Sequence, residues 1–177
     1  MNGFSSVYDI TEYGAVADGR TNAALAFRKA LRACGRAGGG TVYVPAGDFL
    51  TGPIELSSNT TLYLEAGARL LFSSDPADYP VVESRWEGVR RKVYMSCVYA
   101  ANAENVAVEG GGVIDGCGGP WWSAHKAGNL NYPRPKLISF HNCTRVRIRN
   151  VKLTRSPSWT VNPILCDDVT VDGVTIV

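Results

Sequence analysis

The chain has few of the residues from which metal sites, disulfide frameworks and membrane spans are built. It contains 177 residues with only two histidines, and its five cysteines include no Cys-x-x-Cys pair. These counts argue against a zinc site and a disulfide scaffold, and no cofactor-binding motif is found. No run approaches the roughly 18 consecutive apolar residues that span a bilayer. We therefore expect a globular domain with no metal, no cofactor and no membrane partner.

The first residues also lack the features of a secretion signal. Residues 1–6 provide neither a basic segment nor an apolar core. Free thiols would suit a reducing compartment. We expect a cytoplasmic protein, or a secreted one if the true N-terminus is missing.

Acidic residues are absent from one long stretch. No Asp or Glu occurs between Asp115 and Asp167, where eight Lys and Arg residues lie. Residues 1–115 hold 13 acids and 10 bases, a net charge of −3, and residues 116–177 hold 3 acids and 8 bases, a net charge of +5. A positive field favours an anionic partner, although nucleic acid is not expected. Alternatively, these are solvent-facing strand positions, because residues 145–149 alternate arginine with Val or Ile.

One segment has the period of an amphipathic helix. From Thr21 to Cys34, apolar residues recur at steps of three and four, and basic residues occupy the other face. Thr21 or Asn22 can cap the start, and Gly35 can end the helix. Elsewhere, most of the 19 glycines and nine prolines separate short apolar runs, which excludes a helical bundle. We expect this to be the only substantial helix.

Beyond residue 40 the apolar period becomes two, and the short strands repeat. The segment from Cys143 superimposes on the segment from Cys166 with a constant offset of 23 residues. A similar pattern at Val106 lies 40 residues earlier than its counterpart at 146, and another at Leu62 lies 44 residues before Val106. Both longer gaps are interpreted as two repeats.

These units predict a solenoid, because each is too small to bury its own apolar face and must stack on a neighbour. The predicted fold is all-β: a right-handed parallel β-helix forming one incomplete domain over 1–177. An N-terminal strand and capping α-helix fall in 1–40, and coils fall in 41–177 with loops near 79–95 and 116–136. The chain ends at Val177 in strand pattern, so C-terminal coils and a cap are expected to be missing. Self-association through that uncapped edge is an alternative.

The two loops carry aromatic and basic residues that suit an acidic carbohydrate, since aromatic rings stack on sugars and Arg holds carboxylates. The predicted substrate contacts are Arg85, Trp86, Trp121, Trp122, Arg134 and Asn162. The alternative is that the tryptophans seal the loops against the coils.

Few carboxylates invite a catalytic interpretation. Asp167 and Asp168 are adjacent, but in the repeat they replace Thr144 and Arg145, and neighbours on a strand point to opposite faces. A structural role is therefore favoured for the pair. Asp115 is interpreted as a turn residue.

The order of these motifs resembles glycoside hydrolase family 28, the polygalacturonases and related pectin-degrading enzymes. The similar segments are residues 13–19 with the helix, 85–88, 112–116, 121–122, 134–135, 156–160 and the cysteine-led repeats. The resemblance implies a right-handed β-helix and inverting hydrolysis of α-linked galacturonate. It places the family's catalytic motifs (Asn-Thr-Asp, Asp-Asp, Gly-His-Gly and Arg-x-Lys) C-terminal to Val177. No catalytic residue is therefore expected within this chain, which alone is expected to be inactive.

Three hypotheses follow. The first is the N-terminal part of a hydrolase acting on a galacturonate-containing oligo- or polysaccharide. The second is a noncatalytic β-helix module that binds an acidic polysaccharide. The third is a structural protein of the tailspike kind.

Overall fold

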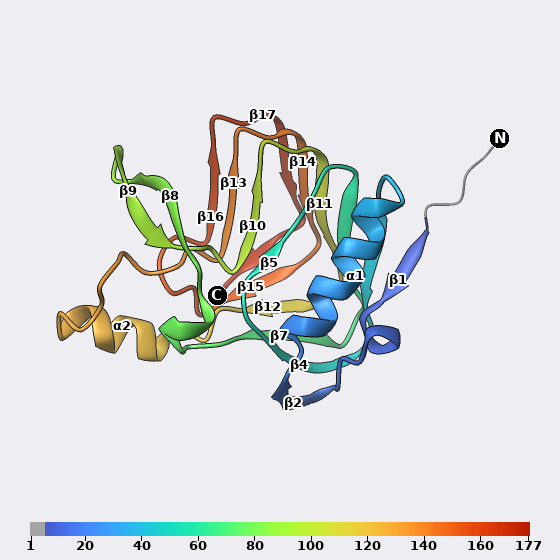
Figure 1. The fold of residues 1–177 in the computed structure, drawn as a ribbon, viewed down its shortest axis with the longest axis horizontal. Helices are drawn as coiled ribbons and strands as arrows, with labels where there is room; N and C mark the ends of the chain where they lie inside the picture. The colour runs from blue at the N-terminus through green and yellow to red at the C-terminus, as the bar shows by residue number, and fades with distance from the viewer. Residues whose placement is uncertain (1–5) are drawn as a thin grey trace.

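The computed structural model describes residues 6–177 and shows a parallel β-helix (Figure 1). The expectation that residues 1–6 carry no secretion signal falls mostly on residues 1–5, which lie outside the described residues. Three parallel sheets run along the stack of coils. The predicted fold class, a parallel β-helix with an N-terminal helix, is confirmed.

The four middle coils contribute one strand to each sheet, whereas the first and last coils of the described chain contribute strands to the first and second sheets only. The first sheet contains β1 (Val7–Asp9), β3 (Gly40–Val44), β6 (Thr60–Leu64), β11 (Glu104–Gly110), β14 (Thr144–Arg149) and β17 (Asp167–Asp172) in that order. The second contains β2 (Asp18–Asn22), β4 (Gly47–Thr51), β7 (Ala68–Phe72), β12 (Val113–Asp115), β15 (Lys152–Thr154) and β18 (Thr175–Ile176). The third contains β5 (Ile54–Glu55), β10 (Val98–Ala101), β13 (Ile138–His141) and β16 (Val161–Ile164).

The strand register confirms most of the predicted repeat. Val146 pairs with Val169 at the predicted offset of 23, and Val106 pairs with Val146 at 40. The alignment at Leu62 was wrong by two residues, because Leu62 pairs with Val108, 46 residues away. A slip of two keeps the same face of a strand inward, so the period alone does not reveal it.

The longer gaps are single coils with inserted loops, and not two repeats as predicted. β6, β11 and β14 are direct neighbours in the first sheet. The loop near 79–95 forms an antiparallel hairpin of β8 (Val81–Trp86) and β9 (Val89–Tyr94). The second loop contains the helix α2 (Gly119–Lys126), which the sequence analysis missed. α2 has only one buried residue, so it lacks the apolar stripe that identifies a helix.

The long helix α1 (Ala24–Arg36) covers the first coil, packing on β1, β3, β5 and the short 3-10 helix η1 (Ile10–Tyr13). Its predicted apolar face, including Phe27 and Ala30, is buried. The predicted boundaries were wrong. Thr21 belongs to β2, and Gly35 lies inside the helix, which ends at Arg36. Asn22 does accept a hydrogen bond from the backbone N–H of Ala24 (2.9 Å), and this helps to start the helix.

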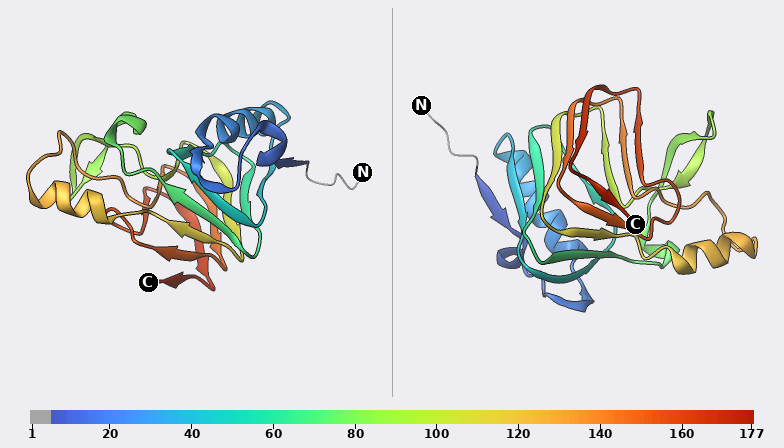
Figure 2. Two further views of the ribbon diagram at one scale, coloured as in Figure 1. Left: turned by 90° about the horizontal axis from the view of Figure 1, so that it is seen from below. Right: turned by 180° about the vertical axis from the view of Figure 1, so that it is seen from behind.

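Inward side chains form ladders across the coils. Phe49, Leu70, Ile114 and Leu153 lie in register on the second sheet, and each is fully buried. Burying such a side chain stabilises the fold by about 1.5–3 kcal/mol before entropy is counted. At the same position in the last coil, Ile176 is 59% exposed. Figure 2 shows α1 at one end of the stack and this last coil, in red, at the other.

The thiols pack as predicted and do not pair. Cys143 is buried and Cys166 is half-buried at the equivalent position of the next coil. All five cysteines are free. Among residues 6–177, no cluster of His, Cys, Asp or Glu has a metal-binding arrangement. Neither helix of this described part has the length and apolar character of a membrane span.

Asparagines turn the chain at the corners of the coils. Asn59, Asn102, Asn105 and Asn142 all have positive φ angles, a left-handed conformation that Asn tolerates better than most residues. Their amides join across coils, since Asn105 donates to Asn59 (3.1 Å) and Asn142 donates to Asn102 (2.7 Å). These ladders hold the corner between the first and third sheets and so fix the face of the third sheet that carries the candidate site.

Candidate substrate cleft

A buried lysine connects several of the predicted contact residues. Lys136 precedes β13 and is 3% exposed. Its Nζ donates to the Arg85 carbonyl oxygen (2.9 Å) and to Asn162 Oδ1 (2.7 Å). It also lies 5.5 Å from the ring centroid of Trp159. Lys136 therefore ties the hairpin β8–β9 to β16.

This lysine has no carboxylate partner among residues 6–177. Burial lowers the pKa of Lys136 to about 8. Burying an ammonium group without a counter-ion is costly, and hydrogen bonds to neutral oxygens compensate only in part. The site therefore holds a positive charge that an incoming anion would stabilise.

Asn162 is held in place by its neighbours. Besides accepting from Lys136, it presents its backbone oxygen to Ser139 Oγ (3.1 Å). Because the side-chain oxygen is engaged by Lys136, the Nδ2 group is the end that can donate to a ligand. The predicted contact at Asn162 thus has an oriented donor.

Two tryptophans stand beside the lysine. Trp86 of β8 meets Trp159 edge to face, with ring centroids 4.4 Å apart and an interplanar angle of 60°. Trp159 is 41% exposed. Such a pair offers both an apolar ring face and a fixed geometry. The sequence analysis named Trp86 but not Trp159 as a contact.

The adjoining cavity has a volume of about 440 Å³ and is lined by Glu83, Ser84, Arg85, Arg90, His141 and Leu165. Arg85 and Arg90 face each other as a cross-strand pair of the hairpin. Like charges directly opposite on a sheet repel each other. Neither guanidinium forms an ion pair with any described residue. An anion bound in this cavity would therefore reduce the repulsion between Arg85 and Arg90, just as an anion near Lys136 would stabilise its buried charge.

A serine and a histidine join the hairpin to the third sheet. Ser84 Oγ and His141 Nε2 are 3.1 Å apart. Burial, and then the positive charges of Lys136 and Arg85, lower the pKa of His141 below its usual value. This lowered pKa favours the neutral form of His141 in the cavity. Neither residue was predicted.

The second loop supplies less to the site than predicted. Trp121 is 1% exposed and packs on Tyr79 (centroids 5.1 Å apart) and Tyr94 (5.5 Å). It cannot reach a ligand, so its assignment as a contact is wrong and the sealing role weighed beside it applies. Trp122 is 47% exposed, and its Nε1 donates to the Ser156 carbonyl (2.9 Å).

Arg134 supports the neighbouring loop. Its Nη1 donates to the Pro157 carbonyl (2.9 Å), two residues before Trp159. Ser158 Oγ in turn donates to the Pro135 carbonyl (2.7 Å). Arg134 thus positions the loop that presents Trp159, and its guanidinium is partly committed to that task.

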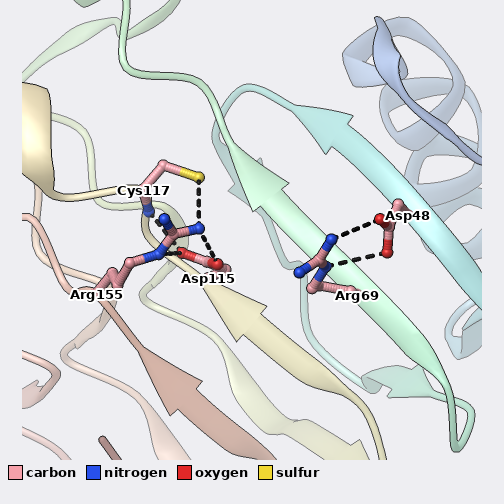
Figure 3. Close-up of polar contacts among 5 residues, drawn as sticks. All are labelled: Asp48, Arg69, Asp115, Cys117 and Arg155. Atoms are coloured by element: carbon pink, nitrogen blue, oxygen red, sulfur yellow. Dashed lines mark hydrogen bonds and ion pairs between the residues drawn. The ribbon is translucent and has the colours of Figure 1, made fainter.

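The second sheet carries a different set of cations (Figure 3). The Asp115 side chain is 4% exposed and accepts two hydrogen bonds from Arg155, one of them from Nε at 2.8 Å. It also accepts from the Cys117 backbone N–H (2.9 Å). Asp115 ends β12 and its side chain holds the turn that follows, as its interpretation as a turn residue predicted; its ion pair with Arg155 was not predicted. A carboxylate held in this way has a structural role.

The remaining charged residues behave as predicted. Arg145 and Arg147 pair with Glu104 (3.1 Å) and Glu109 (3.3 Å) of the preceding coil. The Val and Ile residues that alternate with them are buried. Asp167 and Asp168 are exposed on β17, in register with 144 and 145. The repeat register predicted for Asp167 is confirmed, and the structural role of the aspartate pair stays a prediction.

Together these features define a β-helix protein with a cation-lined cleft suited to an anionic ligand that has apolar faces. Residues 34–177 match the profile of the family described as glycosyl hydrolases family 28, and the chain belongs to this family. It is 37% identical over 176 residues to a probable polygalacturonase of Vitis vinifera, covering 94% of this chain and 36% of that protein. It is 38% identical over 146 residues to an exo-poly-alpha-D-galacturonosidase of Dickeya chrysanthemi, covering 77% of this chain and 23% of that protein.

The chain is also similar in structure to a solved exopolygalacturonase. The hyperthermoactive exopolygalacturonase from Thermotoga maritima superimposes with a TM-score of 0.89 at 31% identity, over 97% of this chain and 47% of that one. The chain spans about a third of the length of curated relatives such as the Vitis vinifera protein.

Proposed function

We propose that this chain forms part of the substrate cleft of a polygalacturonase-like hydrolase, which cleaves α-linked galacturonate in pectin or its oligosaccharides with inversion. One observation carries the proposal: Arg85 and Arg90 line one cavity and Lys136 holds the Arg85 backbone, yet none of the three forms an ion pair with a carboxylate of the described chain, although Glu83 lines the same cavity. Galacturonate carries a carboxylate on every sugar, so each ring can supply the missing anion.

Each residue then has a task. Arg85 and Arg90 bind substrate carboxylates, and Trp86 and Trp159 contact the apolar faces of the rings. Lys136 is a positioning residue, since it holds the Arg85 backbone and Asn162 and adds positive potential beneath the cleft. Together these groups bind and orient the polymer.

Hydrolysis requires more than binding. Inversion uses two carboxyl groups, one as general acid and one to activate water, about 6.5–9.5 Å apart. Of the residues in 6–177, Glu83 is the only carboxylate that lines the cavity. We propose that the catalytic acids belong to a part of the protein outside this chain, so that residues 1–177 alone bind substrate without cleaving it.

A paired assay tests both halves of the proposal. Binding of trigalacturonate to the chain is measured by calorimetry, and reducing ends are counted in the same sample. We expect binding without product, and much weaker binding of the methyl-esterified trimer, which has the same rings but no charge. Equal affinity for both trimers would overturn the assignment of the cleft, and new reducing ends would overturn the assignment of the acids.

A noncatalytic module that binds an acidic polysaccharide is the alternative, favoured by the same unpaired cations. It shares the expected salt dependence of binding. The two differ in the full-length protein, where only the hydrolase releases product. A tailspike-like structural role, or self-association through the last coil, would instead give a stable oligomer in light scattering.

A further inference from the structure

A second concavity lies between α1 and the third sheet. It has a volume of about 730 Å³, within the range of ligand-binding sites. Its accessible apolar lining comprises Ala24, Pro53, Pro80 and Ala101, whereas Phe27, Leu31, Leu56 and Met95 are only 1–9% exposed. It reaches only the base of the hairpin β8–β9, whereas the candidate cleft is lined by residues from the middle of that hairpin. The two concavities therefore have no lining residue in common.

One wall of this groove is a row of arginines. Arg28, Arg32 and Arg36 recur every four residues on α1, which spaces them about 6 Å apart along the helix. None of the three forms an ion pair with any residue in 6–177. The row thus offers a series of positive charges at the rim of an apolar surface.

The groove is also lined by two carboxylates. Glu55 belongs to β5 and Asp78 to the short 3-10 helix η2 (Pro76–Asp78), and Asp78 already accepts a hydrogen bond from Ser73 Oγ (2.5 Å). Carboxylates of a ligand are repelled by these two residues and attracted by the arginines of α1, which favours an orientation with the ligand's charges toward α1.

We propose that this groove is a second binding site for an acidic oligosaccharide, in which Arg28, Arg32 and Arg36 hold the carboxylates and the accessible Pro53 and Pro80 contact the sugar rings. The proposal rests on the proposed function, because the ligand is the same galacturonate polymer. A chain with one carboxylate on each unit presents several anions to this row of arginines. A polymer that bridges both sites would bind more tightly than a short oligomer, through a high effective concentration.

The experiment counts sites. Calorimetry with trigalacturonate should give two sites per chain for the unchanged protein and one for Arg28→Gln/Arg32→Gln/Arg36→Gln. The matched control Arg20→Gln/Lys29→Gln/Arg149→Gln removes the same charge from exposed positions that line neither concavity, and it should retain both sites. Circular dichroism checks that each variant is folded, as expected for substitutions on the surface.

The outcomes separate this proposal from the first. If the groove variant keeps two sites of unchanged affinity, or if hexaglutamate occupies the groove as tightly as the saccharide, the second site is refuted. If Arg85→Gln/Arg90→Gln keeps two sites while the groove variant keeps one, the cleft assignment fails and the groove stands. If trigalacturonate does not bind at all, both proposals fail.

Discussion

The outer face of the second sheet and the cleft beside the third sheet both carry cations, but they provide different partners for them. On the second sheet, Arg69 and Arg155 are paired with aspartates of neighbouring strands (Figure 3). At the cleft, Arg85, Arg90 and Lys136 have no such partner in the described chain. The ion pairs of the second sheet neutralise their own charges and stabilise the stack of coils, whereas the cations of the cleft remain able to bind an anionic ligand.

Breaking the buried pair should give the largest effect. Arg155→Ala leaves the Asp115 carboxylate, 4% exposed, without its cation. We expect a loss of about 3 kcal/mol in the free energy of unfolding, at the low end for a buried pair because the Arg155 side chain is half exposed. Urea denaturation measures it. Arg155→Ala/Asp115→Asn should recover much of the loss, and a loss below 1 kcal/mol for the single variant would contradict the account.

Removing the unpaired arginines should weaken ligand binding and leave the free energy of unfolding nearly unchanged. For Arg85→Gln/Arg90→Gln we expect trigalacturonate affinity at the cleft to fall about 100-fold, since each lost charge-assisted contact is worth about 1.5 kcal/mol. The free energy of unfolding should stay the same or rise slightly, because two facing like charges are gone. Calorimetry and urea denaturation of the same variant test both statements. Lower stability with unchanged affinity would show that the arginines are structural.

Lys136 sharpens the comparison because it is buried and still unpaired. We expect Lys136→Met to weaken binding at the cleft about 30-fold, through loss of both the charge and the positioning of Arg85 and Asn162. Stability should change by less than about 1 kcal/mol, because an apolar residue replaces a desolvated ion. Lys136→Arg keeps the charge and should bind more tightly than Lys136→Met. Equal affinities for the two would contradict an electrostatic role.

The pH dependence separates the charge of Lys136 from its packing. Burial lowers the pKa of Lys136 from 10.5 to about 8. Binding should therefore weaken about tenfold between pH 7 and 9, as the folded chain loses this proton. Stability should rise between pH 8 and 10.5, since only the unfolded chain then holds the proton. Both slopes should be missing in Lys136→Met, and a binding slope that persists in that variant would assign it to another group.

The exposed ion pair should give the smallest effect. Arg69 and Asp48 are joined at 2.6 Å, but their side chains are 44% and 42% exposed. We expect Arg69→Gln to cost less than about 1 kcal/mol, since solvent screens such pairs. Thermal unfolding of Arg69→Gln and Arg155→Ala under the same conditions shows whether the loss of stability is larger at the buried ion pair than at the exposed one. Equal losses would refute the distinction drawn between them.

Much of the fold follows from the sequence because a solenoid repeats. The offset of 23 between the segments at Cys143 and Cys166 fixes the register of the last two coils, and the period of α1 identifies its buried face. The position of Leu62 was misjudged because loops change coil length without changing inward alternation. The helix α2 was missed because it has no apolar stripe in its sequence. It is held to the rest of the chain by the packing of one residue, Trp121.

The candidate site was harder to predict. Arg85, Trp86 and Asn162 were found from their chemistry, but Lys136, which connects them, was counted only as one of eight basic residues and was given no role of its own. Local alternation describes residues 145–149 well, and it cannot show that Lys136 lies beneath a hairpin from 51 residues earlier in the chain. One feature of the sequence did indicate an unpaired cation in this region: no carboxylate occurs between Asp115 and Asp167.

The central claim is that the unpaired cations of the cleft recognise carboxylates. Quenching of tryptophan fluorescence by trigalacturonate and by its methyl ester tests it most directly, because Trp86 follows Arg85 on β8 and packs against Trp159, and no tryptophan lines the groove beside α1. We predict that the unchanged chain prefers the acid over the ester by at least about tenfold, and that Arg85→Gln/Arg90→Gln removes this preference. An unchanged chain that does not distinguish acid from ester, or a variant that retains the full preference, would contradict the account.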